Sequence, residues 1–85
     1  MRRSGMVADI NRDRGMVAIA TDDDGYTIIE IAAGWDVDVG DAMTWEAGFH
    51  IGPTIYENLT KASREGVFVK NHGVNLTELP LQMLK

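Results

Sequence analysis

The chain of 85 residues is long enough for a single small domain, 1–85, of the size that buries only about 60% of its unfolded surface. It contains no cysteine, which excludes disulfide bonds, thiolate zinc sites and cysteine nucleophiles. Its 13 acidic and 8 basic residues give a net charge of −5. Binding of a phosphate backbone would therefore depend on local groups of Lys and Arg.

The N-terminal residues do not resemble a secretory signal. Two arginines are followed by a short apolar stretch that Asp9 interrupts, whereas a secretory signal has a long hydrophobic region. No window approaches the roughly 20 apolar residues that a helix needs to cross a bilayer. We therefore expect a soluble protein and, by default, a cytoplasmic one.

The first third of the chain predicts three strands in a meander. Short β-compatible runs alternate with polar turns that end in Gly15 and Gly25, and glycine tolerates the positive φ that closes such turns. The predicted strands are Met6–Ile10, Met16–Thr21 and Tyr26–Ile31.

Three more strands are predicted in the second half, at Ala42–Ala47, Thr54–Leu59 and Val67–Asn71. Met43 and Trp45 share one face of the fourth strand because strand side chains alternate with a period of two. In the fifth strand the same period puts Ile55 and Leu59 opposite Tyr56 and Asn58. The segments Ala47–Pro53 and Lys61–Gly66 contain glycine or proline and are predicted to be loops.

A short helix is predicted near the C-terminus. Leu79 and Met83 are four residues apart, which is helical spacing. With Thr77 as the N-cap, Pro80 occupies the third helical position, where its missing N–H has no intrahelical partner to lose. We expect this helix to pack its leucines on the strands.

The strands do not alternate cleanly between apolar and polar residues, since Ile28 is next to Ile29, and Met16, Ala18 and Ala20 are apolar as well. Parts of the sheet should therefore be covered on both faces or lie at a bend. A closed barrel with a helix or loop over one mouth meets this requirement. The predicted fold is all-β, a five- to six-stranded OB-like barrel with a short C-terminal helix.

The order of strands and turns resembles the OB fold, in particular the cold-shock and translation-factor-type domains. The matching pieces, within about residues 4–60, are Ser4-Gly5-Met6-Val7, Arg14-Gly15-Met16-Val17, Asp24-Gly25-Tyr26 and Val39-Gly40-Asp41. The resemblance is to a pattern of turns rather than to a signature, and a Src-homology-type barrel is the alternative.

The resemblance implies binding of single-stranded nucleic acid through aromatic residues on the second and third strands. This chain has only Tyr26 in those strands. The two loops that flank the usual OB ligand face offer a basic-aromatic pair instead, namely Arg12 and Arg14 in one loop and Phe49 and His50 in the other. These four residues are the predicted nucleic-acid-binding residues.

Three aspartates, Asp36, Asp38 and Asp41, lie within six residues. An EF-hand loop counted from Asp36 would have Ala47 where it needs a bidentate Glu, so the calcium motif fails. We interpret the cluster as a hydrated turn, with Trp35, Val37 and Val39 on one face.

The other chemistry-bearing residues form no recognisable site. The two histidines, His50 and His72, lie in or beside glycine-containing turns, and their spacing does not favour a zinc site. Ser4 and Ser63 lack the histidine and nucleophile elbow that an activated serine needs. No catalytic residue, metal or cofactor is predicted, and the two tryptophans are expected to fill the core or a barrel end.

The leading functional hypothesis is a non-enzymatic OB-like module that binds single-stranded RNA or DNA. The alternative is a protein-interaction or homo-oligomeric assembly module without a nucleic-acid role. In that case exposed apolar residues such as Ile28, Met6 or the C-terminal leucines would bury against another chain.

Overall fold

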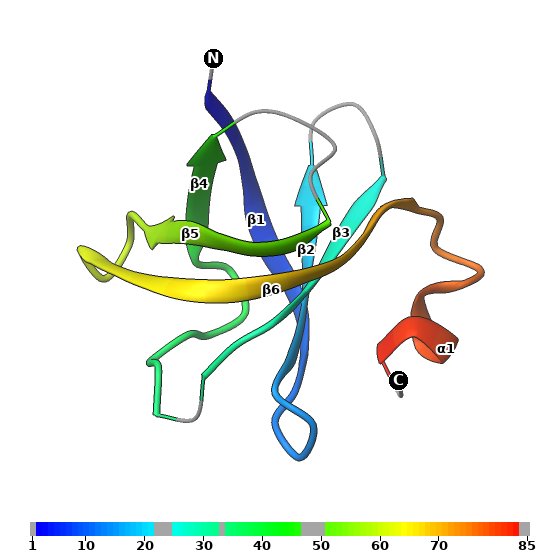
Figure 1. Cartoon of the computed structure of the whole chain (residues 1–85). Helices are drawn as coiled ribbons and strands as arrows, with labels where there is room; N and C mark the ends of the chain where they lie inside the picture. The colour runs from blue at the N-terminus through cyan, green and yellow to red at the C-terminus, as the bar shows by residue number, and fades with distance from the viewer. Residues whose placement is uncertain (1, 22–24, 33, 47–50, 84–85) are drawn as a thin grey trace.

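The computed structural model describes residues 2–21, 25–32, 34–46 and 51–83. Within these ranges the chain forms six strands and one short helix (Figure 1). The strands are β1 (Arg2–Asn11), β2 (Met16–Thr21), β3 (Tyr26–Glu30), β4 (Ala42–Glu46), β5 (Gly52–Asn58) and β6 (Ser63–Val74), and the helix is α1 (Leu79–Met83). None of the described helical residues belongs to a helix long and apolar enough to cross a membrane.

The strands close into an antiparallel barrel with the order β1-β2-β3-β6-β5-β4, in which β4 pairs back onto β1. The barrel consists of two three-stranded meanders, β1–β3 and β4–β6, joined edge to edge. The prediction of a small all-β barrel with a C-terminal helix is confirmed, and OB-like architecture is confirmed at this general level.

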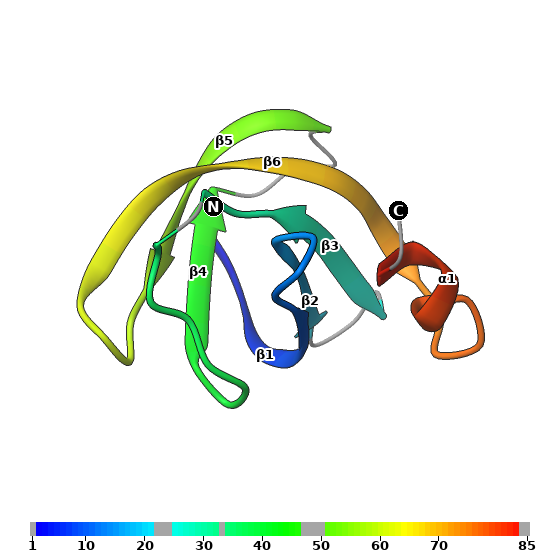
Figure 2. The ribbon, with the colours of Figure 1, turned by 90° about the horizontal axis from the view of Figure 1, so that it is seen from below.

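The sixth strand is much longer than predicted, because the segment predicted as a loop before it belongs to the strand. A tight turn over residues 59–62, with Ala62 at a φ of 53°, lets β6 begin at Ser63. The first part of β6 pairs with β5 and the last part with β3. Figure 2 shows β6 curving over the barrel. Its length follows from this double pairing, which closes one side of the barrel.

The barrel interior is filled by the inward-facing residues of all six strands. Met43 and Trp45 of β4 are buried together, as predicted. In β5 the predicted division into two faces is also correct: Tyr56 and Asn58 point inward, while Ile55 is 49% exposed. Trp45 and Tyr56 stack, with ring centroids 4.6 Å apart and ring planes within 7°.

A second apolar cluster lies on the outside of the barrel, under α1. It joins Met16, Ala18 and Ile28 of β2 and β3 to Leu79 and Met83 of the helix. The prediction that the sheet is covered on both faces is therefore correct, but the helix covers the outer face of β2 and β3 rather than a barrel mouth. Ile28 is fully buried there, so its predicted role as an exposed interaction residue is wrong.

The predicted N-cap is wrong: Asn75, not Thr77, caps a turn over residues 76–78, and α1 follows from Leu79. Asn75 Oδ1 accepts a hydrogen bond from the Glu78 backbone N–H at 2.9 Å, and the Asn75 carbonyl accepts one from the Leu79 N–H at 3.1 Å. Asparagine is a strong capping residue because its side-chain oxygen reaches the free N–H groups of the next turn.

Gly5, in β1, occupies a crowded position against β2. A Cβ atom there would lie 2.5 Å from the Ala20 carbonyl oxygen and 2.7 Å from Ile19 Cγ2. Gly5→Ala is therefore expected to lower the free energy of unfolding by about 1–3 kcal/mol, measured by urea denaturation. Gly66→Ala is the control, because the nearest atom to its Cβ is 4.0 Å away. Equal stability of the two variants would contradict the argument.

Tyr56 is fully buried, and its hydroxyl has no hydrogen-bond partner within the described residues. Burial also raises the pKa of Tyr56, because the charged phenolate would lose hydration in the barrel interior. Tyr56→Phe removes the hydroxyl and keeps the stacked ring, and is expected to raise the free energy of unfolding by about 1 kcal/mol. Tyr26→Phe, at a half-buried ring, is the control in the same urea titration. Destabilisation by Tyr56→Phe would mean that the hydroxyl has a partner.

Candidate functional site

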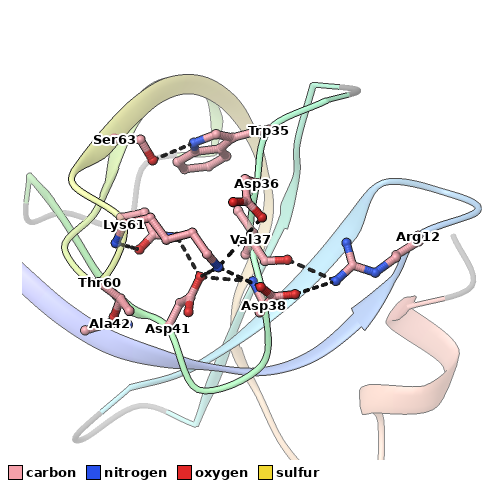
Figure 3. A network of polar contacts seen from close by, with 11 residues as sticks. Arg12, Trp35, Asp36, Val37, Asp38, Asp41, Ala42, Thr60, Lys61 and Ser63 are labelled. Atoms are coloured by element: carbon pink, nitrogen blue, oxygen red, sulfur yellow. Dashed lines mark hydrogen bonds and ion pairs between the residues drawn. The ribbon is translucent and has the colours of Figure 1, made fainter.

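The segment that connects β3 to β4 is fixed in place by Asp41, which is buried. Asp41 Oδ2 accepts hydrogen bonds from the Asp38 backbone N–H at 3.0 Å, from Asn58 Nδ2 at 2.8 Å and from Lys61 Nζ at 2.6 Å (Figure 3). The prediction of a hydrated turn is therefore wrong for Asp41. The turn is folded inward because both Asn58 and Lys61, at the β5–β6 turn, supply donors for this carboxylate.

Lys61 holds all three aspartates of the segment. Its Nζ is 2.6 Å from Asp41, 2.8 Å from Asp38 and 3.8 Å from Asp36. Hydrogen bonds to Asp38 and Asp41 raise the pKa of Lys61, and the hydrogen bond from Lys61 lowers the pKa of Asp38. The ammonium group thus occupies the position that a cation would need among these carboxylates, and within the described residues no group of three or more ligating side chains could hold a metal ion.

The electrostatics of Asp41 combine two opposing effects. Burial alone would raise the pKa of its carboxyl group, but hydrogen bonds from Lys61 and Asn58 outweigh burial and lower the pKa to about 2. Asp41 is therefore ionised at neutral pH. The Lys61 cluster, defined as Lys61 with Asp36, Asp38 and Asp41, joins the β3–β4 connection to the β5–β6 turn.

Two further contacts fix the ends of the same segment. Arg12, on the β1–β2 turn, donates to the Val37 carbonyl at 3.1 Å and to Asp38 Oδ1 at 2.9 Å. The Trp35 indole N–H donates to Ser63 Oγ at 3.0 Å. Val37 is buried as predicted, but Val39 is 63% exposed, so the predicted common face of the three apolar residues is wrong. The cause is the inward turn at Asp41.

The fixed segment and the β1–β2 turn enclose a groove of about 580 Å³. We call it the Trp35 groove. Arg12, Arg14 and Gly15 line one side, Gly34, Trp35 and Asp36 line the other, and Ile10, Asp13, Ile31 and Ala32 complete the lining. Trp35 is half-buried and packs against the core while lining the groove. A tryptophan and two arginines therefore line one concave surface.

Two of the four predicted site residues lie in this groove, and two fall outside the described part of the chain. Arg12 and Arg14 line the groove, and both are exposed. Phe49 and His50 lie outside the described residues. Glu46, the last described residue before them, pairs with Arg2, which is at the other end of β1 from Arg12. The joint placement of the two loops stays a prediction.

The outer face of β2 and β3 offers no open surface at its centre. Met16, Ala18 and Ile28, which point outward there, are buried beneath α1. The face that the OB resemblance implied for ligand binding is thus occupied by this chain's own helix. His72, which was predicted to lie in or beside a glycine-containing turn, is half-buried in β6, with Nδ1 3.0 Å from Thr27 Oγ1.

The sequence reasoning missed Trp35 as a groove residue. Its position directly after Gly34, in the connection between two predicted strands, could have indicated a loop aromatic at a barrel end, since functional residues concentrate on loops that a rigid scaffold positions. Comparison of the chain with protein-family models, with curated proteins and with solved structures finds no match.

Proposed function

We propose that this barrel is a non-catalytic cytoplasmic module that binds single-stranded nucleic acid in the Trp35 groove. The observation that carries the proposal is that Trp35, Arg12 and Arg14 line one concave surface. A base stacks on an aromatic ring with a gain of about 1–3 kcal/mol, and guanidinium groups bind phosphate. The resemblance to cold-shock domains adds fold-level analogy only.

The charges around the groove favour contact with a phosphate at Arg14. Its side chain is exposed and forms no ion pair with another described residue. Arg12 is 63% exposed but is engaged with Asp38. Asp13 and Asp36 also line the groove and oppose a polyanion, so the proposed affinity is modest and falls with salt concentration.

Labelled single-stranded RNA and DNA, titrated at low and moderate salt and followed by fluorescence anisotropy, test this proposal. Trp35→Ala is expected to weaken binding about tenfold or more, because it removes the stacking ring. Val39→Ala is the control, since Val39 is an exposed apolar residue of the same segment outside the groove. Thermal melts establish that both variants are folded. Absence of binding by the wild-type chain at low salt would refute the proposal.

A second candidate function is protein interaction or homo-oligomeric assembly through the outer face of β5 and β6. Ile55 is 49% exposed and Phe68 is 43% exposed on this face. Neighbouring exposed apolar residues are typical of interaction surfaces. Sedimentation of the wild-type chain tests self-association, and Ile55→Asp is expected to convert any dimer to a monomer. If the wild-type chain is a monomer at all concentrations, self-association is excluded and the partner would be a different protein.

A further inference from the structure

A second groove, of about 600 Å³, lies on the outer face of β5 and β6. We call it the Phe68 groove. It is lined by Pro53, Ile55, Gly66 and Phe68, by Glu30 at the end of β3, and by Ile31 and Ala32 after that strand. Ile31 and Ala32 also line the Trp35 groove. The two grooves therefore lie next to each other, with these two residues as their common border.

The Phe68 groove combines an exposed ring with an adjacent cation. Phe68 is 43% exposed, and Lys70 Nζ lies 5.3 Å from the centroid of its ring. Both residues point outward from β6, because they are two residues apart on the strand. Gly66, further along the same face, has no side chain to cover Ile55 opposite it. Phe68 and the apolar floor beside it thus line the groove, while Lys70 lies over one face of the ring.

We propose that a single nucleic-acid strand bound in the Trp35 groove continues across Ile31 and Ala32 and stacks a second base on Phe68, with Lys70 contacting its phosphate. This inference rests on the proposed function and adds a second stacking position and a longer binding site. It rests on the two residues that the grooves share and on the cation over one face of the ring, which a purely apolar partner would not need.

Lys70 already forms an ion pair with Glu30, which a phosphate of the bound strand would have to replace. Its Nζ is 3.6 Å from Glu30 Oε1, and both side chains are substantially exposed. Exposed ion pairs of this kind contribute little in water, so a phosphate can replace the carboxylate at small cost. Replacing Glu30 by glutamine removes the competing charge and is expected to tighten binding of a long strand.

The test compares two strand lengths, about 4 and about 12 nucleotides, within the range of site sizes known for small barrels. Anisotropy titrations with oligothymidine and oligouridine are made with the wild-type chain, Phe68→Ala, Lys70→Gln and Leu59→Ala. Leu59→Ala is the matched control, because Leu59 is an exposed apolar residue that lines neither groove. Sedimentation of each variant accompanies the titrations.

We expect the wild-type chain to bind the long strand more tightly than the short one. Phe68→Ala should weaken binding of the long strand about tenfold and leave the short strand unchanged. Lys70→Gln should lower the salt dependence for the long strand only, by a slope of about 0.7. Leu59→Ala should match the wild type with both lengths.

Three results would overturn the inference in distinguishable ways. If both lengths bind with equal affinity and Phe68→Ala changes neither, the path ends in the Trp35 groove and the proposed function survives. If neither strand binds, the proposed function fails as well. If the wild-type chain is a dimer that Phe68→Ala converts to a monomer, the Phe68 groove is a protein interface and the second candidate function takes its place.

Discussion

Replacement of Asp41 by alanine is expected to lower the free energy of unfolding by about 3 kcal/mol, measured by urea denaturation at pH 7. The carboxylate accepts hydrogen bonds from Asn58, from Lys61 and from the Asp38 backbone N–H. Asn58 is only 1% exposed, so its amide would be left buried without an acceptor. The cost of such an orphaned donor exceeds the net gain from one ordinary hydrogen bond.

Asp36→Ala is the matched control for this variant. It removes the same charge from the same cluster, but Asp36 is 78% exposed and lies 3.8 Å from Lys61 Nζ. An exposed ion pair at that distance contributes little, so a change within about 0.5 kcal/mol is expected. Equal destabilisation by the two variants would mean that net charge, rather than the buried hydrogen bonds of Asp41, stabilises the segment.

The contribution of Asp41 should also depend on pH. The pKa of Asp41 is about 2 in the folded chain, below its model-compound value of 3.8. The unfolded chain therefore takes up the proton first as the pH falls. The stability from this group is complete above pH 3.8 and is lost as the pH falls towards 2. The difference between the wild type and Asp41→Ala should narrow over that interval, and an unchanged difference would contradict the assignment.

Most of the strands could be predicted from the sequence, because the turns between them depend on residues that are close together in the chain. Gly15 and Gly25 take positive φ values of 66° and 75° in the turns where the pattern placed them. The start of β6 was missed because Ser63–Gly66 is polar and glycine-containing, which is typical of a loop. Pairing with β5 overrides that local preference, as long-range contacts commonly do in sheets.

The candidate site was predicted only in part, because its geometry depends on contacts distant in sequence. Arg12 and Arg14 were found from their place in a turn. The burial of Asp41 could not be read from its neighbours, since it depends on Asn58 and Lys61, which are 17 and 20 residues away. Those contacts fix the connection that carries Trp35, which lines the same groove as the arginines. The pattern of apolar and polar residues in the segment itself does not predict these contacts.

The arginines of the Trp35 groove give the largest expected effect on binding. Arg14→Gln should lower the slope of log affinity against log salt by about 0.7, and Arg12→Gln with Arg14→Gln by about 1.4, if each contacts one phosphate of a single strand. The double variant should lose about 10- to 100-fold in affinity at low salt, measured by anisotropy. Arg12 also donates a hydrogen bond to the Val37 carbonyl, so its replacement removes a contact that fixes the β3–β4 connection. The single Arg14 variant keeps that contact and therefore measures the phosphate contact by itself.

Arg64→Gln is the charge-matched control for Arg14→Gln. Arg64 is exposed on β6 and lines neither groove, so its replacement changes the net charge by the same amount at another site. If the polyanion is attracted only by overall charge, the two variants lose affinity and salt dependence equally. If the groove binds it, Arg64→Gln keeps the wild-type slope while Arg14→Gln does not.

Because the chain carries a net charge of −5, a purely global effect would also predict negligible binding by the wild type. Measurable binding with a slope that responds to Arg14 and not to Arg64 therefore identifies the Trp35 groove as the contact surface.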